Sequence, residues 1–254
     1  MKILLTRSPE QNEQLHAAIS STIVSTIGLT IGLTTADIIS VPLLLTEALV
    51  FTETSKQCVL GLDQFDDLIF ISRNAVHFSL DALEQYWPQW PIHLRWFAVG
   101  SGTAEALSRA HVTVVYPKTA SSEGLLALPE LGDVAGRKSL IMRGVGGRET
   151  LRQGLEARGA LVQYLETYRR VPIPFNTEDV PVDNDVIALL YSGEAITHLI
   201  DSGGAEVQNY RLIVPSARLQ HVANELGFAK VELANSQEDH AMLQVLQQML
   251  RQMP

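Results

Sequence analysis

The chain has 254 residues, of which 46% are hydrophobic and 19% are charged, an ordinary composition for a globular protein of two lobes. Its formal net charge of −9 argues against nucleic acid as the main partner. The single cysteine, Cys58, excludes an intrachain disulfide and fits a reducing cytoplasm, and the seven scattered histidines predict no metal site.

The N-terminal region contains an uncharged segment, residues 17–36, with Gly28 and Gly32 at the GxxxG spacing of membrane helices. Eight of its twenty residues are Ser or Thr, and its β-branched content favours a strand or loop. We therefore expect no membrane helix. A secretory signal is also not expected, because MKILLTRSPE turns polar after three apolar residues.

The rest of the chain alternates between short apolar runs and segments with apolar spacings of three and four, which predicts an α/β fold with parallel sheets flanked by helices. Ten strands are predicted, at 2–6, 38–44, 67–72, 95–100, 112–116, 139–143, 161–170, 186–192, 211–216 and 230–234. Eight helices are predicted, at 10–19, 74–86, 102–110, 123–131, 148–159, 194–202, 217–227 and 239–250.

An internal duplication divides these elements into two sets. FISRNAVHF resembles LYSGEAITH, AVGSGTAEAL resembles IVPSARLQHV, and LLTRSPEQNEQL resembles LIMRGVGGRETL. The matches pair Ser72 with Ser192, Ser101 with Ser216, and Arg7 with Arg143.

The order of these three units differs between the two copies, so a complete set requires the N-terminal unit to fold with the C-terminal part. We therefore predict two domains, one formed by residues 1–38 together with 173–254, and an inserted one formed by 39–172, which includes two linker strands. Open parallel sheets bind ligands beyond the carboxyl ends of their strands. We expect these polar residues of both lobes to face a shared cleft.

Several of the candidate residues also have a structural interpretation. Ser72, Arg73 and Asn74 follow a strand, where Ser72 suits a helix cap. Arg73 has no capping use and is the better ligand candidate. The remaining hydroxyl candidates fit a cap at least as well as a ligand contact, and they are Ser101, Thr103, Ser192 and Ser216.

The turn RGVGGRETL lies in a basic region, because residues 137–170 hold eight basic and three acidic side chains. We interpret it as a carboxylate-binding turn, in which Gly144 and Gly147 let the backbone approach an anion and Arg143 or Arg148 adds charge-assisted hydrogen bonds. Alternatively, the glycines only allow a tight turn and Arg143 pairs with a local acid. A dinucleotide loop is the weaker interpretation, because GxGG replaces GxGxxG.

Together, LLTR, FISRNAV, AVGSGTAEAL, EGLLALPEL, RGVGGRETL, RGALVQYLETYRR, YSGEA and VPSARLQHVANELGF make the chain resemble the uroporphyrinogen-III synthase family over nearly its whole length. The resemblance implies two similar α/β lobes joined by a two-stranded β linker, with no cofactor and no metal. It implies a cytoplasmic lyase of tetrapyrrole biosynthesis that closes linear hydroxymethylbilane and inverts its last ring. Pro9 comes one position later than in the family's TRP motif.

The family's substrate carries eight carboxylates, so the resemblance implies a site rich in hydrogen-bond donors, such as helix N-termini. Tyr168 matches a family tyrosine proposed to help the hydroxyl leave, and packing in the linker is its structural alternative. The expected partners are hydroxymethylbilane and, transiently, the enzyme that makes it.

Two other functions stay open from the sequence. A two-lobed binding or sensor protein would use the same hinge and cleft without chemistry, and a nucleotide-dependent oxidoreductase is the third choice. No heptad repeat is present, so we expect a monomer.

Overall fold

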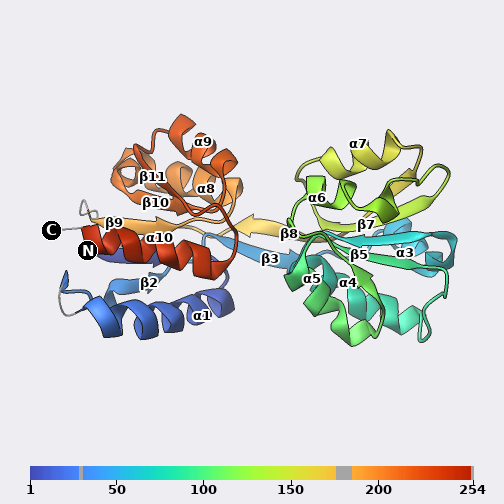
Figure 1. Ribbon diagram of the computed structural model, residues 1–254, viewed down its shortest axis with the longest axis horizontal. Coiled ribbons are helices and arrows are strands. Elements are labelled where there is room, and N and C mark those ends of the chain that lie inside the picture. The colour runs from blue at the N-terminus through green and yellow to red at the C-terminus, as the bar shows by residue number, and fades with distance from the viewer. Residues whose placement is uncertain (29–30, 176–184, 253–254) are drawn as a thin grey trace. The chain divides into compact units, whose positions relative to one another are not determined.

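The computed structural model describes residues 1–28, 31–175 and 185–252 of the chain (Figure 1). The chain forms two compact units, unit 1 with Met1–Leu45 and Val171–Pro254, and unit 2 with Thr46–Arg170. The sequence placed the borders at 38/39 and 172/173, whereas the structure places them at 45/46 and 170/171. Residues 39–45 and 171–172 thus lie in unit 1.

Unit 1 contains a five-stranded parallel sheet in the order β11-β10-β9-β1-β2. The N-terminal strand β1 pairs with β9 of the C-terminal half, with Ile3 opposite Ile187. These two strands carry hydrophobic residues on both faces, as expected when helices cover both sides of a parallel sheet. The strands are β1 (Lys2–Leu5), β2 (Ile38–Ser40), β9 (Val186–Leu189), β10 (Arg211–Val214) and β11 (Lys230–Leu233).

Two pairs of helices cover the two faces of this sheet (Figure 1). Buried side chains such as Leu15 and Leu246 place α1 and α10 on one face, and Ile196 and Leu219 place α8 and α9 on the other. The helices are α1 (Pro9–Ile19), α8 (Gly193–Gly203), α9 (Ala217–Glu225) and α10 (Asp239–Gln252).

The expectation of a strand or loop after α1 was wrong, because Ser20–Gly28 continues that helix as a π-helix. Ile19 and Ile23 are buried against the sheet, and this packing favours a helical path. The hydroxyls of Ser21 and Thr22 donate to the carbonyl of Ala18, so the polar side chains bond to the helix backbone. Throughout the described residues, no helix is both long and apolar enough to span a membrane.

Unit 2 contains a six-stranded sheet in the order β3-β8-β7-β4-β5-β6. Its strands are β3 (Leu44–Ala48), β4 (Asp67–Phe70), β5 (Arg95–Ala98), β6 (Val114–Val115), β7 (Lys138–Gly144) and β8 (Leu161–Pro172). Strands β4 to β8 are parallel. Strand β3 runs antiparallel to β8, since the amide of Ile173 bonds to Leu43 and that of Leu49 to Thr167.

The helices of unit 2 include one that the sequence did not predict, α3, which Thr52 caps through the amide of Ser55. The predicted strand 38–44 is in fact two strands, β2 and β3, separated at Pro42, which has no N–H for a sheet hydrogen bond. The helices are α3 (Glu53–Leu60), α4 (Arg73–Tyr86), α5 (Ser101–Ala106), α6 (Ser122–Leu126) and α7 (Thr150–Glu156).

Short 3-10 turns complete the two units, at Thr35–Asp37, Leu62–Gln64, Leu107–Ala110, Pro129–Leu131 and Gly204–Asn209.

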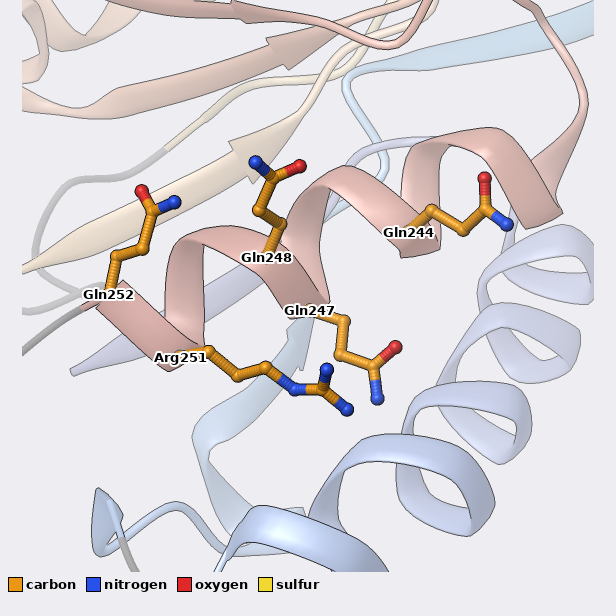
Figure 2. Close-up of a pocket in the computed structure, with 5 residues that line it drawn as sticks. All are labelled: Gln244, Gln247, Gln248, Arg251 and Gln252. Atoms are coloured by element: carbon orange, nitrogen blue, oxygen red, sulfur yellow. The ribbon is translucent and has the colours of Figure 1, made fainter.

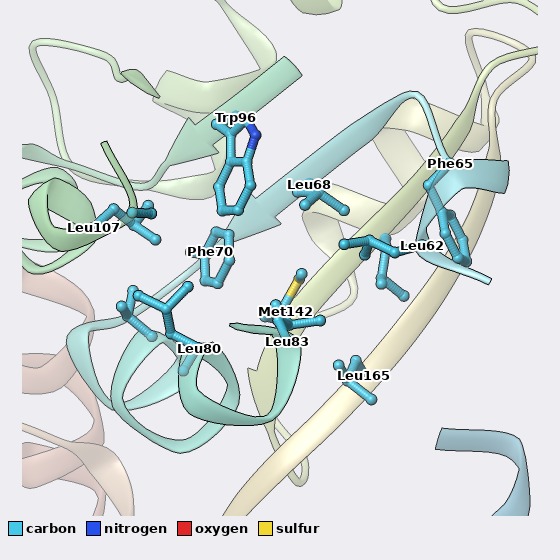
Figure 3. Close-up of a cluster of buried hydrophobic side chains, with 14 of the residues drawn as sticks. Leu62, Phe65, Leu68, Phe70, Leu80, Leu83, Trp96, Leu107, Met142 and Leu165 are labelled. Carbon is cyan, nitrogen blue, oxygen red and sulfur yellow. The ribbon is translucent and has the colours of Figure 1, made fainter. Parts of the chain in front are cut away.

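The core of unit 2 lies on both faces of its sheet. On the face covered by α3, α4 and α5, Phe70 stacks on Trp96 with ring centroids 5.7 Å apart, and Leu80, Leu83 and Leu165 belong to the same buried cluster (Figure 3). The other face packs against α6 and α7. Such continuous burial fixes the strand ends from which the candidate residues project.

Candidate functional site

Ser72 is the N-cap of α4, directly beyond the carboxyl end of β4, as the sequence predicted. Its Oγ accepts a hydrogen bond from the amide of Ala75 at 2.9 Å. The same Oγ lies 3.0 Å from the hydroxyl of Tyr168. Capping and a contact with Tyr168 are thus combined in one side chain.

Tyr168 reaches this position through a bulge in β8. Arg143 pairs with Glu166 and Gly144 pairs with Tyr168, so Thr167 is an extra residue in the ladder. Leu165 and Tyr168 are three residues apart and still pack into the same core cluster, which regular alternation would forbid. The bulge therefore turns the phenol toward Ser72.

Gly144 makes room for the ring of Tyr168. A Cβ atom at position 144 would lie 2.5 Å from Cε2 and 2.6 Å from Cζ of that ring. Phe78 of α4 contacts the ring with centroids 5.7 Å apart, and the side chain of Tyr168 is buried. The glycine that we predicted to admit an anion instead admits the tyrosine.

Arg73 and Asn74 begin α4 next to Ser72. Arg73 is exposed, and within the described part of the chain its guanidinium has no ion-pair partner. Its Nε would lie 3.7 Å from a Cβ placed at Gly102, so it lies beside the first turn of α5. Asn74 donates to Thr46 Oγ1 at 3.3 Å. Arg73 is therefore available to an anion at this edge.

The capping interpretation of Ser101 was wrong, because Gly100 is the N-cap of α5 and Ser101 is the first helical residue. A Cβ at Gly100 would lie 2.6 Å from that of Ala120, so the close approach of backbone at this position requires glycine. Ser101 is exposed and Thr103 is buried. The hydroxyl of Ser101 is left to face solvent at the carboxyl edge of the sheet.

The glycine-rich turn is a tight turn whose arginines are both paired. Gly146 and Gly147 have positive φ angles of 77° and 93°, which favour glycine. Arg148 donates to Glu123 at 2.7 Å, on the surface. Arg143, only 3% exposed, donates to Glu149 at 3.0 Å, as in the alternative interpretation given above.

Arg143 belongs to a cluster that sequence reasoning missed. Its guanidinium lies 4.4 Å from the ring centroid of Tyr164, whose hydroxyl donates to Glu149 at 2.7 Å. Burial, followed by the bond to Glu149, raises the pKa of Tyr164 to about 12. Tyr164 and Arg143 together hold the pKa of Glu149 below its usual range. Glu149 could have been predicted as the partner of Arg143, because it is the only acid in the turn. Tyr164 could not, because its place beside Arg143 depends on how β8 pairs with β7.

In unit 1, Ser192 and Ser216 are the N-caps of α8 and α9. Ser192 accepts from the amide of Ala195 at 3.1 Å, and Ser216 accepts from Leu219 at 3.4 Å. Their positions, beyond β9 and β10, correspond to the strand ends of unit 2 in the duplication. Both side chains are half-buried, and a hydroxyl oxygen that accepts one hydrogen bond keeps a second lone pair for another donor.

Arg7 follows β1 and has a cluster of its own. It donates to Asp239 at 2.7 Å and lies 4.5 Å from the ring centroid of Tyr191. Tyr191 donates to the same carboxylate oxygen at 3.2 Å, and burial, followed by the charge of Asp239, raises the pKa of Tyr191. Asn12 accepts from the amide of Arg7 and fixes the turn. Sequence reasoning missed Tyr191, although it directly precedes Ser192.

Two pockets in the described part of the chain lie away from these residues. One, of about 380 Å³, lies on α10, where four glutamines and Arg251 project from the helix (Figure 2). The other, of about 480 Å³, lies at the start of β7 and β8 and includes Lys138 and Leu161. Neither contains a predicted site residue. Among the described residues, no three His, Cys, Asp or Glu side chains are grouped to hold a metal ion.

A family model described as uroporphyrinogen-III synthase HemD matches residues 30–244 of the chain. The uroporphyrinogen-III synthase of Salmonella typhimurium (strain LT2) is 35% identical over 201 residues, which cover 72% of this chain and 79% of that protein. The uroporphyrinogen-III synthase of Escherichia coli (strain K12) is 33% identical over 205 residues, covering 74% and 80%.

Among solved structures, a mutant uroporphyrinogen III synthase from the extremely thermophilic bacterium Thermus thermophilus is similar over 100% of both chains, with a TM-score of 0.67. Its sequence identity of 18% makes this a likeness of fold alone. Together with the family model and the two relatives, it leads to one assignment. The chain belongs to the uroporphyrinogen-III synthase family.

Proposed function

We propose that the protein closes hydroxymethylbilane to uroporphyrinogen III with loss of water, and that Tyr168 donates a hydrogen bond to the departing hydroxyl. Family membership supports the reaction. The observation that supports the role of Tyr168 is its hydrogen bond to Ser72, 3.0 Å long, at the carboxyl end of β4. The reaction is that of a lyase and belongs to tetrapyrrole biosynthesis.

The proton arrangement at Ser72 suits this role. Ser72 Oγ already accepts from the amide of Ala75. If the Ser72 hydroxyl donates its own proton to Tyr168 Oη, the phenolic proton is free to point at a leaving oxygen. The pyrrole nitrogens push electrons toward the breaking C–O bond, so a hydrogen bond from a neutral phenol is sufficient help. The contribution of Tyr168 is therefore modest.

Binding of the eight carboxylates falls, in this proposal, to the carboxyl edges of the sheets. Arg73, which has no ion-pair partner among the described residues, offers its guanidinium beside the first turn of α5. The N-termini of α4, α8 and α9 add backbone amides, which attract anions without adding net charge. Ser101, Ser192 and Ser216 add hydroxyls at the same strand ends. The protein then acts chiefly by holding a flexible chain in a shape that can cyclise.

The compartment, the oligomeric state and the partner are proposed from the same family membership. We propose a cytoplasmic monomer that needs no cofactor and meets the enzyme supplying hydroxymethylbilane only transiently. Its single cysteine, Cys58, is free and buried, which suits a reducing compartment.

The test is to add purified protein to freshly made hydroxymethylbilane and to separate the oxidised products by isomer. The spontaneous reaction gives the type I isomer, because it closes the ring without inversion. We expect the type III isomer with protein and type I in buffer alone. Only type I product in both samples would contradict the proposed function.

A further inference from the structure

Arg7 and Arg143 have the same chemical surroundings, although they lie in different units. Each guanidinium lies against a tyrosine ring, at 4.5 Å and 4.4 Å from the centroid. Each donates to a carboxylate, Asp239 at 2.7 Å and Glu149 at 3.0 Å. In both clusters the tyrosine hydroxyl donates to the same carboxylate. An arginine and a phenol thus converge on one carboxylate in each unit.

Simple inheritance from the duplication does not explain this likeness. The two arginines correspond, but Tyr191 follows the strand β9, whereas Tyr164 lies within β8. The acids differ as well, because Glu149 comes from the turn six residues after Arg143, and Asp239 comes from α10, at the other end of the sequence from Arg7. The common feature is therefore a site for a carboxylate. A different element supplies the acid in each unit, the turn before α7 in unit 2 and α10 in unit 1.

The donors and the acids differ in how far they are exposed to solvent. Arg143 and Tyr164 lie on the paired strands β7 and β8, and Arg143 is 3% exposed. Glu149 is 46% exposed and follows Gly146 and Gly147, two residues with positive φ. In unit 1 the side chain of Arg7 is 17% exposed and that of Asp239 is 38% exposed. In each pair the arginine is the less exposed partner and the acid is the more exposed one, so the acid is the partner that solvent and a ligand reach first.

We propose that Glu149 and Asp239 occupy two carboxylate sites as internal stand-ins, and that carboxylates of the substrate displace them from Arg143 with Tyr164 and from Arg7 with Tyr191. The inference rests on the proposed function for the identity of the ligand, a polycarboxylate. It makes the two acids residues that set affinity, because each competes with the substrate for a cation. Bonds from Tyr164 and Arg143 keep the pKa of Glu149 low, so this competitor is ionised at neutral pH.

The experiment measures two quantities on Glu149→Gln. One is KM for hydroxymethylbilane, and the other is calorimetric binding of tricarballylate, a small tricarboxylate, at fixed ionic strength. Gln keeps the size of the side chain but removes the competing charge. We expect KM to fall and tricarballylate to bind about threefold more tightly, the scale of one partly exposed ion pair. Circular dichroism checks that the variant is folded.

The matched control is Asp81→Asn, which removes an exposed, arginine-paired carboxylate from α4 of the same unit. It changes the net charge equally and should leave both quantities at the wild-type value. For unit 1, Asp239→Asn should behave as Glu149→Gln does, with the exposed Glu225 of α9 giving the control Glu225→Gln. The second pair keeps the test decisive if Glu149→Gln folds poorly.

The outcomes separate this inference from the proposed function. Unchanged or weaker tricarballylate binding in both acid variants, or no binding in any protein, would overturn the stand-in role and assign both clusters to structure. Tighter binding in both, with no conversion of hydroxymethylbilane by the wild type, would leave the carboxylate sites standing and remove the proposed substrate.

Discussion

The two units share capping serines and a tyrosine-stacked arginine, but they differ in one strand. In unit 1, β1 pairs with β2 and β9 in regular register. In unit 2, the pairing of β7 with β8 shifts by one residue at Gly144, and Tyr168 joins the capping serine of α4. None of the described residues in unit 1 makes such a tyrosine–cap contact. The comparison teaches that the capping serines and the stacked arginines are common to both units, whereas the bulge brings a tyrosine hydroxyl to a capping serine in unit 2, the contact on which the proposed role of Tyr168 depends.

The largest expected effect concerns Gly144→Ala. A methyl group there would overlap the ring of Tyr168, so the variant should lose about 2 kcal/mol of unfolding free energy. Gly193→Ala, at the first residue of α8 in unit 1, is the control, because its Cβ would meet only Leu219 at 3.7 Å and Arg218 at 3.9 Å and change stability by about 0.5 kcal/mol or less. Urea unfolding compares the two. Equal stability of both variants would show that the ring is not held against Gly144.

The capping serines should separate stability from turnover. Ser72→Ala and Ser192→Ala each remove one side-chain cap, at a cost of about 1 kcal/mol in unfolding free energy. Only Ser72 also contacts Tyr168, so only Ser72→Ala should lower kcat. Thermal unfolding and steady-state rates measure the two effects. An equal fall of kcat in both variants would mean that the two units contribute alike to the reaction.

The smallest expected effect concerns an ion pair of unit 1 at the amino ends of β1 and β2. Asp37 accepts from Lys2 at 2.9 Å, and this bond is the main cause that lowers the pKa of Asp37 to about 2. The pair should contribute about 1 kcal/mol or less, because solvent screens it. Its contribution is complete above the unfolded pKa of 3.8 and is lost as the pH falls toward 2.

Asp37→Asn should accordingly be less stable than the wild type at neutral pH, and the difference in urea midpoint should shrink below pH 3.8. Asp201→Asn, an exposed residue of α8, is a suitable control for the loss of one charge. A difference that stays constant from neutral pH down to pH 3 would rule out the ion pair as its source.

Much of the fold could be predicted from sequence, because apolar periodicity reports which side of an element is buried. The strand at 139–143 and the helix at 74–86 agree with β7 and α4 to within a residue or two. Residues 20–28 could not be predicted in this way, because hydroxyls bonded to the helix backbone allowed Ser and Thr to remain helical. The single strand predicted at 38–44 was wrong for another reason. Apolar content alone does not show that the run is divided into two strands at Pro42.

The candidate site was less predictable than the fold. A serine after a strand indicates a cap, and Ser72, Ser192 and Ser216 are caps in the structure. The role of Gly144 depends on a bulge in another strand, which has no local sequence signal. The acid opposite Arg7 is Asp239, and no pattern near Arg7 indicates it. Long-range pairing of charged side chains emerges only when the sheet register is known.

The most direct test of the account is Tyr168→Phe, which removes only the hydroxyl and keeps the ring between Gly144 and Phe78. We expect kcat for formation of the type III isomer to fall about tenfold, equivalent to ~1.4 kcal/mol in the barrier, with KM and thermal stability close to the wild type. An unchanged kcat would contradict a catalytic role for Tyr168 and reduce the Ser72 contact to packing.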